Sequence, residues 1–219
     1  MSLTLRSLDH VALWTDQREA LAGFLLERTG VHEIERTGDF TLLGADARRG
    51  KVTLFDAEGP RDPGALERVV LRVADLDAAA KRAGGETFTA PGGLNLGLVN
   101  GAAGDVDYDL DHIVLRVPDP DHSAEALAAL GFERRDGVVA VADRVVRLEA
   151  GGRREGPRPL LNHLAVLVDS AAEVHQEAER NGWGIDDVKD AANTFAIFVR
   201  GPDGIRVEYV EHKPGFALK

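Results

Sequence analysis

Hydrophobic and polar residues follow one order along the chain, and that order occurs four times. Each unit opens with a strand in which apolar and polar positions alternate, continues with an amphipathic helix, and closes with short strands separated by turns. The opening strands are predicted at residues 8–14, 67–73, 110–117 and 162–168, and the helices at about 16–28, 76–83, 123–130 and 170–180. A unit that recurs at intervals of roughly 45 to 60 residues predicts a repeat architecture. We therefore expect an α+β fold made of four βαβββ units.

The opening strands carry a histidine at one fixed place in three of the four units. These histidines are His10, His112 and His163, whereas Arg68 occupies the place in the second unit. Residues two apart on a strand share a face, and the aliphatic face is expected to pack on the helices. By this rule His112, His163 and Glu208 all point away from the helices, into the concave side of a sheet. Two imidazoles and one carboxylate form a ligand set for a divalent metal.

A stretch rich in Gly and Ala turns acidic at residues 100–107, which is typical of a domain boundary. We expect an N-terminal domain of residues 1–104 and a C-terminal domain of residues 105–219, each with a concave mixed sheet.

Composition and charge narrow the class of partner. The 219 residues carry a formal net charge of −11, which argues against binding to a phosphate backbone. There is no cysteine, so disulfides and thiolate metal sites are excluded. No apolar run is long enough to span a membrane, and the start lacks the apolar segment of a secretory signal. We expect a cytoplasmic protein whose partner is a small molecule.

The repeated units, the strand-borne histidines and the Gly-Pro-Asp-Gly turn at residues 201–204 resemble the vicinal oxygen chelate superfamily. That group includes glyoxalase I, bleomycin-resistance proteins, fosfomycin-resistance enzymes and type I extradiol ring-cleaving dioxygenases. The resemblance covers nearly the whole chain and is greatest to the two-domain dioxygenases. It implies two glyoxalase-like domains, a small-molecule substrate, homodimers in many relatives, and a metal held by His112, His163 and Glu208.

The resemblance also implies that the first domain has lost its metal. His10 matches His112, but Arg68 stands where His163 stands in the other half, and a guanidinium has no lone pair for a cation. Residues 95–100 offer no carboxylate. We therefore expect His163→Ala to abolish metal binding and His10→Ala to leave it intact.

Two histidines and one carboxylate leave coordination positions open, as in non-haem Fe(II) oxygenases. Fe(II) or Mn(II) is favoured, and Zn(II) and Ni(II) also suit these ligands. The resemblance then implies an oxidoreductase that opens the ring of a catechol or a similar molecule with adjacent oxygens. Candidate substrate-binding residues are Arg116, Arg206, Phe198 and Asn193. Trp14 is not expected to mark the pocket.

Two departures leave other functions open. Ring-cleaving relatives place an acid–base histidine late in the third unit, where this chain has none, and a tyrosine where Phe198 stands. His212 shares the strand face of Glu208 if that strand continues, but it is expected to be a solvated tail residue. The alternatives are a metal-dependent isomerase, epimerase or lyase of the glyoxalase type, with a fourth ligand near Arg147 or Glu149, or a non-catalytic protein that binds drugs.

Overall fold

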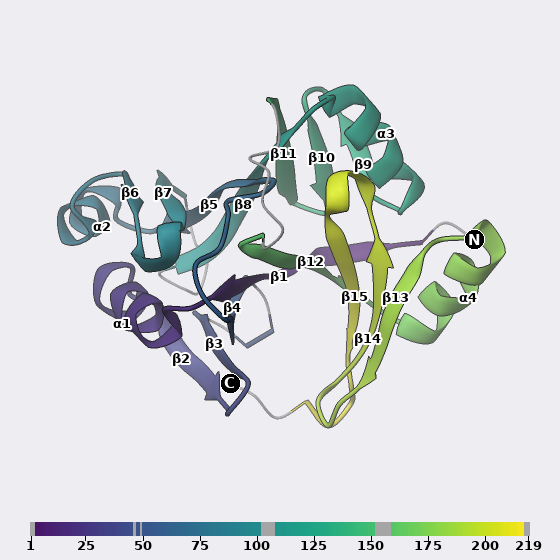
Figure 1. The fold of residues 1–219 in the computed structure, drawn as a ribbon, viewed down its shortest axis with the longest axis horizontal. Coiled ribbons are helices and arrows are strands. Elements are labelled where there is room, and N and C mark those ends of the chain that lie inside the picture. Colours follow the sequence, from purple (N-terminus) through teal and green to yellow (C-terminus); the bar gives the residue numbers. More distant parts are fainter. Residues whose placement is uncertain (1–2, 46, 49, 102–107, 152–158, 217–219) are drawn as a thin grey trace.

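A computed structural model describes residues 3–45, 47–48, 50–101, 108–151 and 159–216. These residues form two mixed sheets of eight and seven strands and four α-helices (Figure 1). The predicted α+β class and the four units of strand, helix and further strands are confirmed. None of the helices in the described ranges is both long and apolar enough to cross a membrane.

The larger sheet has the strand order β13-β14-β15-β12-β1-β4-β3-β2. Its strands are β1 (Leu5–Thr15), β2 (His32–Arg36), β3 (Phe40–Gly44), β4 (Lys51–Asp56), β12 (Leu161–Val168), β13 (Ile185–Asp190), β14 (Thr194–Arg200) and β15 (Arg206–His212).

The smaller sheet has the order β6-β7-β5-β8-β11-β10-β9. Its strands are β5 (Leu66–Val73), β6 (Thr87–Thr89), β7 (Asn95–Asn100), β8 (Tyr108–Val117), β9 (Glu133–Arg135), β10 (Val138–Val141) and β11 (Arg144–Ala150).

The helices are α1 (Arg18–Arg28), α2 (Leu76–Ala83), α3 (Pro120–Ala129) and α4 (Ala171–Asn181), with single 3-10 turns η1 (Pro91–Gly93) and η2 (Pro202–Gly204). The side chains of Asp75, Asp119 and Ser170 accept a backbone N–H at the starts of α2, α3 and α4. Gly84 and Gly182 end α2 and α4 in the left-handed conformation. Polar caps therefore begin three of the four helices, and glycine stops end two of these three.

The two sheets do not follow the expected halves of the chain. The larger sheet joins the first unit to the fourth through antiparallel β1 and β12, and the smaller joins the second to the third through β5 and β8 (Figure 1). Each expected half therefore contributes one unit to each sheet, and the boundary expected at residues 104/105 lies outside the described residues. All four opening strands present the same alternation, so the pattern cannot tell which two will pair.

The aliphatic faces of the opening strands are buried as predicted. On β8, Ile113, Leu115 and Val117 are fully buried in a continuous hydrophobic core that includes residues of both sheets and of all four helices. The opposite face of each opening strand carries the polar residues together with apolar ones such as Ala165. On the larger sheet this face carries the candidate site.

Candidate metal centre

Three side chains from three strands of the larger sheet converge at one point: His10 of β1, His163 of β12 and Glu208 of β15. The two Nε2 atoms of His10 and His163 are 3.0 Å apart, and Glu208 Oε2 lies 3.1 Å from the first and 2.8 Å from the second. Among the residues that the structure describes, this is the one group of three metal-ligating side chains whose ligand atoms all lie within 4.8 Å of one another.

The predicted grouping of His112 with His163 and Glu208 is therefore wrong in one member. His112 lies on β8 in the other sheet, opposite Val70. His10, which sequence reasoning assigned to a vestigial site, takes its place. The cause is the pairing of the first unit with the fourth, which places β1 and not β8 beside β12.

A β-bulge in front of each histidine aims it into the site. The register between β1 and β12 shifts between Leu8 and His10, which makes Asp9 an extra residue, and a second shift makes Asn162 extra before His163. A bulge breaks the period-two rule, so both members of each pair line the same cavity. His10 Nδ1 lies 2.7 Å from Asp9 Oδ2, and His163 Nδ1 lies 3.0 Å from Asn162 Oδ1. An acceptor at Nδ1 leaves the Nε2 lone pair free for a cation.

The smaller sheet has the same bulge before a histidine, but it lacks the set of three ligands. His112 Nδ1 lies 2.6 Å from Asp111 Oδ1, and Asp111 is the extra residue of another register shift. Arg68 stands on β5, diagonal to His112, as His10 stands to His163 in the larger sheet. Because a guanidinium stands in place of an imidazole, this site of the smaller sheet is unsuitable for a metal.

The ladder registers also identify the places that correspond to Glu208. On β15, Glu208 pairs with Ala165, which lies two residues after His163. The residue two after His10 is Ala12, and it pairs with Thr53 of β4, a buried side chain. The larger sheet therefore has one carboxylate and one threonine at the two symmetric places.

The equivalent places in the smaller sheet are Gly97, which pairs with Val70, and Arg147, which pairs with Val114. The suggested fourth ligand near Arg147 or Glu149 thus falls in the sheet that lacks the convergent trio. Neither residue lines the cavity that contains the trio.

The charges of the trio favour a cation. Burial would lower the pKa of His10, but Glu208 and Asp9 raise that pKa to about 9. Burial lowers the pKa of His163. Burial would raise the pKa of Glu208, but His163 and His10 outweigh it and hold that pKa far below its usual range. In the metal-free protein His10 thus carries a proton that the ionised Glu208 stabilises, and a divalent metal would take the place of that proton.

Asp9 connects the trio to two further groups. Lys51 Nζ donates to its carboxylate at 2.9 Å, and His212 Nε2 lies 3.1 Å from its Oδ1. Burial would raise the pKa of Asp9, but Lys51, His10 and His212 together hold the pKa well below its ordinary value. The ionised Asp9 therefore accepts hydrogen bonds from both His10 and His212.

The trio opens into a cavity of about 800 Å³ between the first and fourth units. Five aromatic side chains line it: Trp14, Phe40, Phe55, Phe198 and Phe216. The expectation that Trp14 lies away from the pocket is wrong, because it assumed the pairing of the first unit with the second. These rings provide flat apolar walls for a small molecule.

Three of the four predicted substrate-binding residues line this cavity. They are Asn193, Phe198 and Arg206. The ring of Phe198 meets the ring of His163 edge-on at 5.2 Å, and the guanidinium of Arg206 lies 4.1 Å from the centre of the Phe198 ring. Arg116 is the exception, because it lies on β8 and pairs with Glu67 at 3.0 Å.

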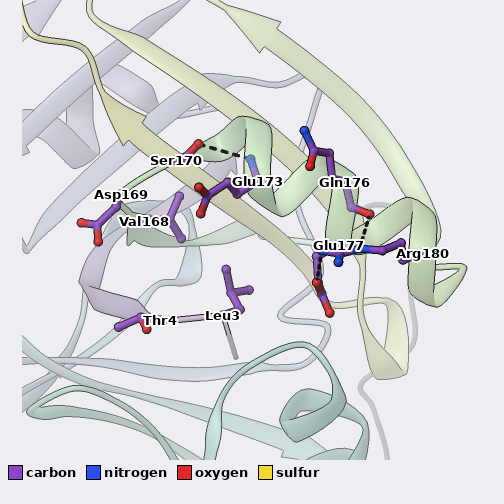
Figure 2. A pocket seen from close by; sticks show the side chains of 9 residues that line it. All are labelled: Leu3, Thr4, Val168, Asp169, Ser170, Glu173, Gln176, Glu177 and Arg180. Carbon is purple, nitrogen blue, oxygen red and sulfur yellow. Dashed lines mark hydrogen bonds and ion pairs between the residues drawn. The ribbon is translucent and has the colours of Figure 1, made fainter. Parts of the chain in front are cut away.

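A second hollow lies between the N-terminal segment and α4 (Figure 2). Leu3 and Thr4 form one side, and Glu173 and Arg180 of α4 form the other. It contains no histidine, and Arg180 is already paired with Glu177. The hollow therefore lacks the ligand set of the trio.

Comparison with known proteins agrees with the fold. Residues 109–209 match the family model described as Glyoxalase/Bleomycin resistance protein/Dioxygenase superfamily. No curated protein matches the chain in sequence.

Solved structures share the fold at low sequence identity. A putative dioxygenase from Bacillus subtilis is 18% identical with a TM-score of 0.80, and the match covers 99% of this chain and 88% of that one. Glyoxalase I from Zea mays is 18% identical with a TM-score of 0.72, covering 95% and 92%. The CppA protein from Streptococcus pneumoniae is 11% identical with a TM-score of 0.64, covering 95% and 99%.

Proposed function

Since residues 109–209 belong to the glyoxalase/bleomycin resistance protein/dioxygenase superfamily and the whole chain has its fold, we propose that the protein is a metal-dependent enzyme. Its substrate is a small molecule with two adjacent oxygen atoms. His10, His163 and Glu208 hold one divalent cation, with Fe(II) or Mn(II) as the favoured ions. The convergence of their three ligand atoms within 4.8 Å carries this proposal.

The proposed reaction is the ring-cleaving oxygenation of a catechol-like substrate. When bound, the metal supplies Lewis acidity, a template for the adjacent oxygens and an electron path to dioxygen. Three protein ligands are typical of Fe(II) oxygenases, because they leave positions open. Thr53 at the place symmetric to Glu208 supports this reaction over an isomerisation that uses four charged or imidazole ligands.

The residues of the cavity have separate tasks in this proposal. Phe55 and Phe198 flank His163, with ring centres 6.4 and 5.2 Å from its own, and are placed to hold a flat ring beside the ligands. Their apolar surfaces exclude water, which strengthens the electrostatic interactions of the site. Phe198 has no hydroxyl, so a proton must be handled by another group.

Metal analysis and oxygen uptake test the proposal together. The protein is purified without metal, loaded anaerobically with Fe(II) or Mn(II), and analysed for metal per chain. It is then exposed to a panel of catechols in an oxygen electrode, with labelled dioxygen and mass spectrometry of the products. We expect one metal per chain and a ring-opened product that contains both atoms of the labelled oxygen.

Two outcomes would contradict parts of this proposal. Failure of the wild-type protein to bind any divalent metal would contradict the metal centre itself. One bound metal with no oxygen consumed, but with isomerisation of a thiol–methylglyoxal adduct, would replace the oxygenase with an enzyme of the glyoxalase type.

A further inference from the structure

His212 is the last residue of β15, and its side chain is only 10% exposed. It lines the cavity of the trio, so the expectation of a solvated tail residue is wrong. Its ring stacks on Phe216 with centres 4.3 Å apart and planes at 16°. The guanidinium of Arg48 lies 5.3 Å from the other ring of this stack, that of Phe216. The imidazole is thus held in place on one face.

A carboxylate fixes the orientation of the His212 ring. Its Nε2 lies 3.1 Å from Asp9 Oδ1. Asp9 is buried and also accepts from Lys51 and His10, so this carboxylate has little freedom to move. An imidazole whose one nitrogen donates to a fixed carboxylate offers its second nitrogen as a base, which is the arrangement of catalytic histidines in general.

Three other titratable side chains of the cavity, Asp187, Lys189 and Arg206, already form ion pairs. Asp187 pairs with Lys189 at 3.2 Å, and Arg206 lies 2.7 Å from Asp186. Glu35 lies on β2 and Asp39 lies in the turn before β3, so neither is on a strand that carries one of the three ligands.

The remaining titratable side chains of the cavity, apart from His212, are the trio and the pair of Lys51 and Asp9 beside it. His10, His163 and Glu208 are the proposed ligands, and Lys51 and Asp9 form a buried pair. His212 is therefore the histidine of the described cavity that is neither a ligand nor in contact with one.

We propose that His212 is the proton carrier of this site and that Asp9 is its positioning residue. This inference rests on the proposed function. As a substrate hydroxyl engages the site, its O–H bond breaks, an N–H bond forms at Nδ1 of His212, and the electron pair stays on the substrate oxygen. The resulting imidazolium is stabilised by the Asp9 carboxylate, and the same proton is returned to the product.

The test uses 4-nitrocatechol, whose absorption moves to longer wavelength with each proton lost. Metal-loaded wild-type protein is mixed with it anaerobically at pH 7, and its spectrum gives the number of protons that remain on the bound probe. Calorimetry in two buffers of different ionisation enthalpy gives the number of protons released to solvent. We expect the wild-type protein to bind the fully ionised probe while keeping one proton.

His212→Gln keeps a donor toward Asp9 but cannot accept a proton. We expect this variant to bind one metal per chain as before and to release one more proton to the buffer than wild type, or to hold the probe with one proton still on it. Asp9→Asn should give the same proton shift with weaker metal binding. The matched control is His122→Gln on the exposed surface of α3, which should behave as wild type.

The two proposals fail in different ways. Wild-type protein that binds 4-nitrocatechol equally with and without metal would overturn the proposed function, and this inference with it. Metal-dependent binding with the same proton count in wild type and His212→Gln would overturn the role of His212 alone.

Discussion

Ala12 of β1 lies directly opposite His163 of β12, and this pairing brings the ring of His10 to within 3.0 Å of the ring of His163. The two histidines are 153 positions apart in sequence. Their contact depends on the first unit joining the fourth. His112 is nearer to His163 in sequence than His10 is, but the same arrangement places His112 in the other sheet.

Replacing His10 should therefore remove the metal. His10→Ala deletes one of three ligands, and we expect the affinity for Fe(II) or Mn(II) to fall by at least ~100-fold, as when an essential ligand is lost. His112→Ala should leave metal content unchanged, because His112 lies in the other sheet. Metal per chain after dialysis, measured by mass spectrometry, checks both. Equal retention by the two variants would disprove the assignment of His10.

Asp9, whose carboxylate lies next to Nδ1 of His10, should also affect the affinity for the metal. Asp9→Asn replaces the ionised acceptor at His10 Nδ1 with a neutral amide, and loss of such a partner typically costs about 10- to 100-fold in metal affinity. The control is Asp111→Asn, which alters the same contact behind His112. Competition with a coloured chelator measures both affinities. A similar loss in the two variants would indicate a general effect on folding instead.

Metal-free protein should lose stability as the pH rises toward 10. Burial would lower the pKa of His10, but Glu208 and Asp9 raise it to about 9, above the ordinary value of histidine. Because the pKa is raised in the folded state, the stabilisation is complete below pH ~6.5 and disappears as the pH passes through about 9. Melting temperatures of metal-free protein between pH 6 and 10 should fall over this window.

A metal reverses that dependence, because it competes with the proton on His10. With saturating Mn(II), the melting temperature should rise with pH over the lower part of the same range. His10→Gln has no such proton, so its metal-free form should show a flatter profile. An unchanged slope in His10→Gln would mean that another group titrates.

The sequence carries enough information for the units but not for their pairing. Alternating strands specify each unit locally, and Asp or Ser caps begin three of the four helices. The structure has the order of strand, helix and further strands in all four units, although the second unit has two closing strands, β6 and β7, where three are expected. Pairing depends on contacts between strands far apart in the chain, such as Leu8 with Val166. Since each opening strand has a similar aliphatic face, the pattern favours no one partner, and His10 and His112 could not be told apart.

The two ligands within the fourth unit were predictable because their geometry is local to that unit. His163 and Glu208 lie on adjacent parallel strands of one unit, in which Ala165 pairs with Glu208. The bulges break the strand alternation on which the prediction rests, and the Asp or Asn before each histidine is the signal that marks them. The place of His212 does not follow from its own unit, because its partner, Asp9, comes from the first unit.

Thr53 occupies the place symmetric to Glu208, and its replacement tests the proposed reaction class. Thr53→Glu places a second carboxylate at the site symmetric to Glu208, where the chain now has a short neutral side chain. A fourth ligand should preserve or tighten metal binding while occupying a position that substrate or dioxygen needs.

We expect Thr53→Glu to bind one metal per chain but to take up oxygen with catechols at least ~10-fold more slowly than wild type, as for other losses of a required site interaction. Thr53→Val is the matched control, because it keeps the size of the side chain and adds no ligand. Its oxygen uptake should stay within about twofold of wild type, since the hydroxyl has no assigned role. If Thr53→Glu oxidised catechols as fast as Thr53→Val, the open position would not be needed and oxygenation at this metal would be excluded.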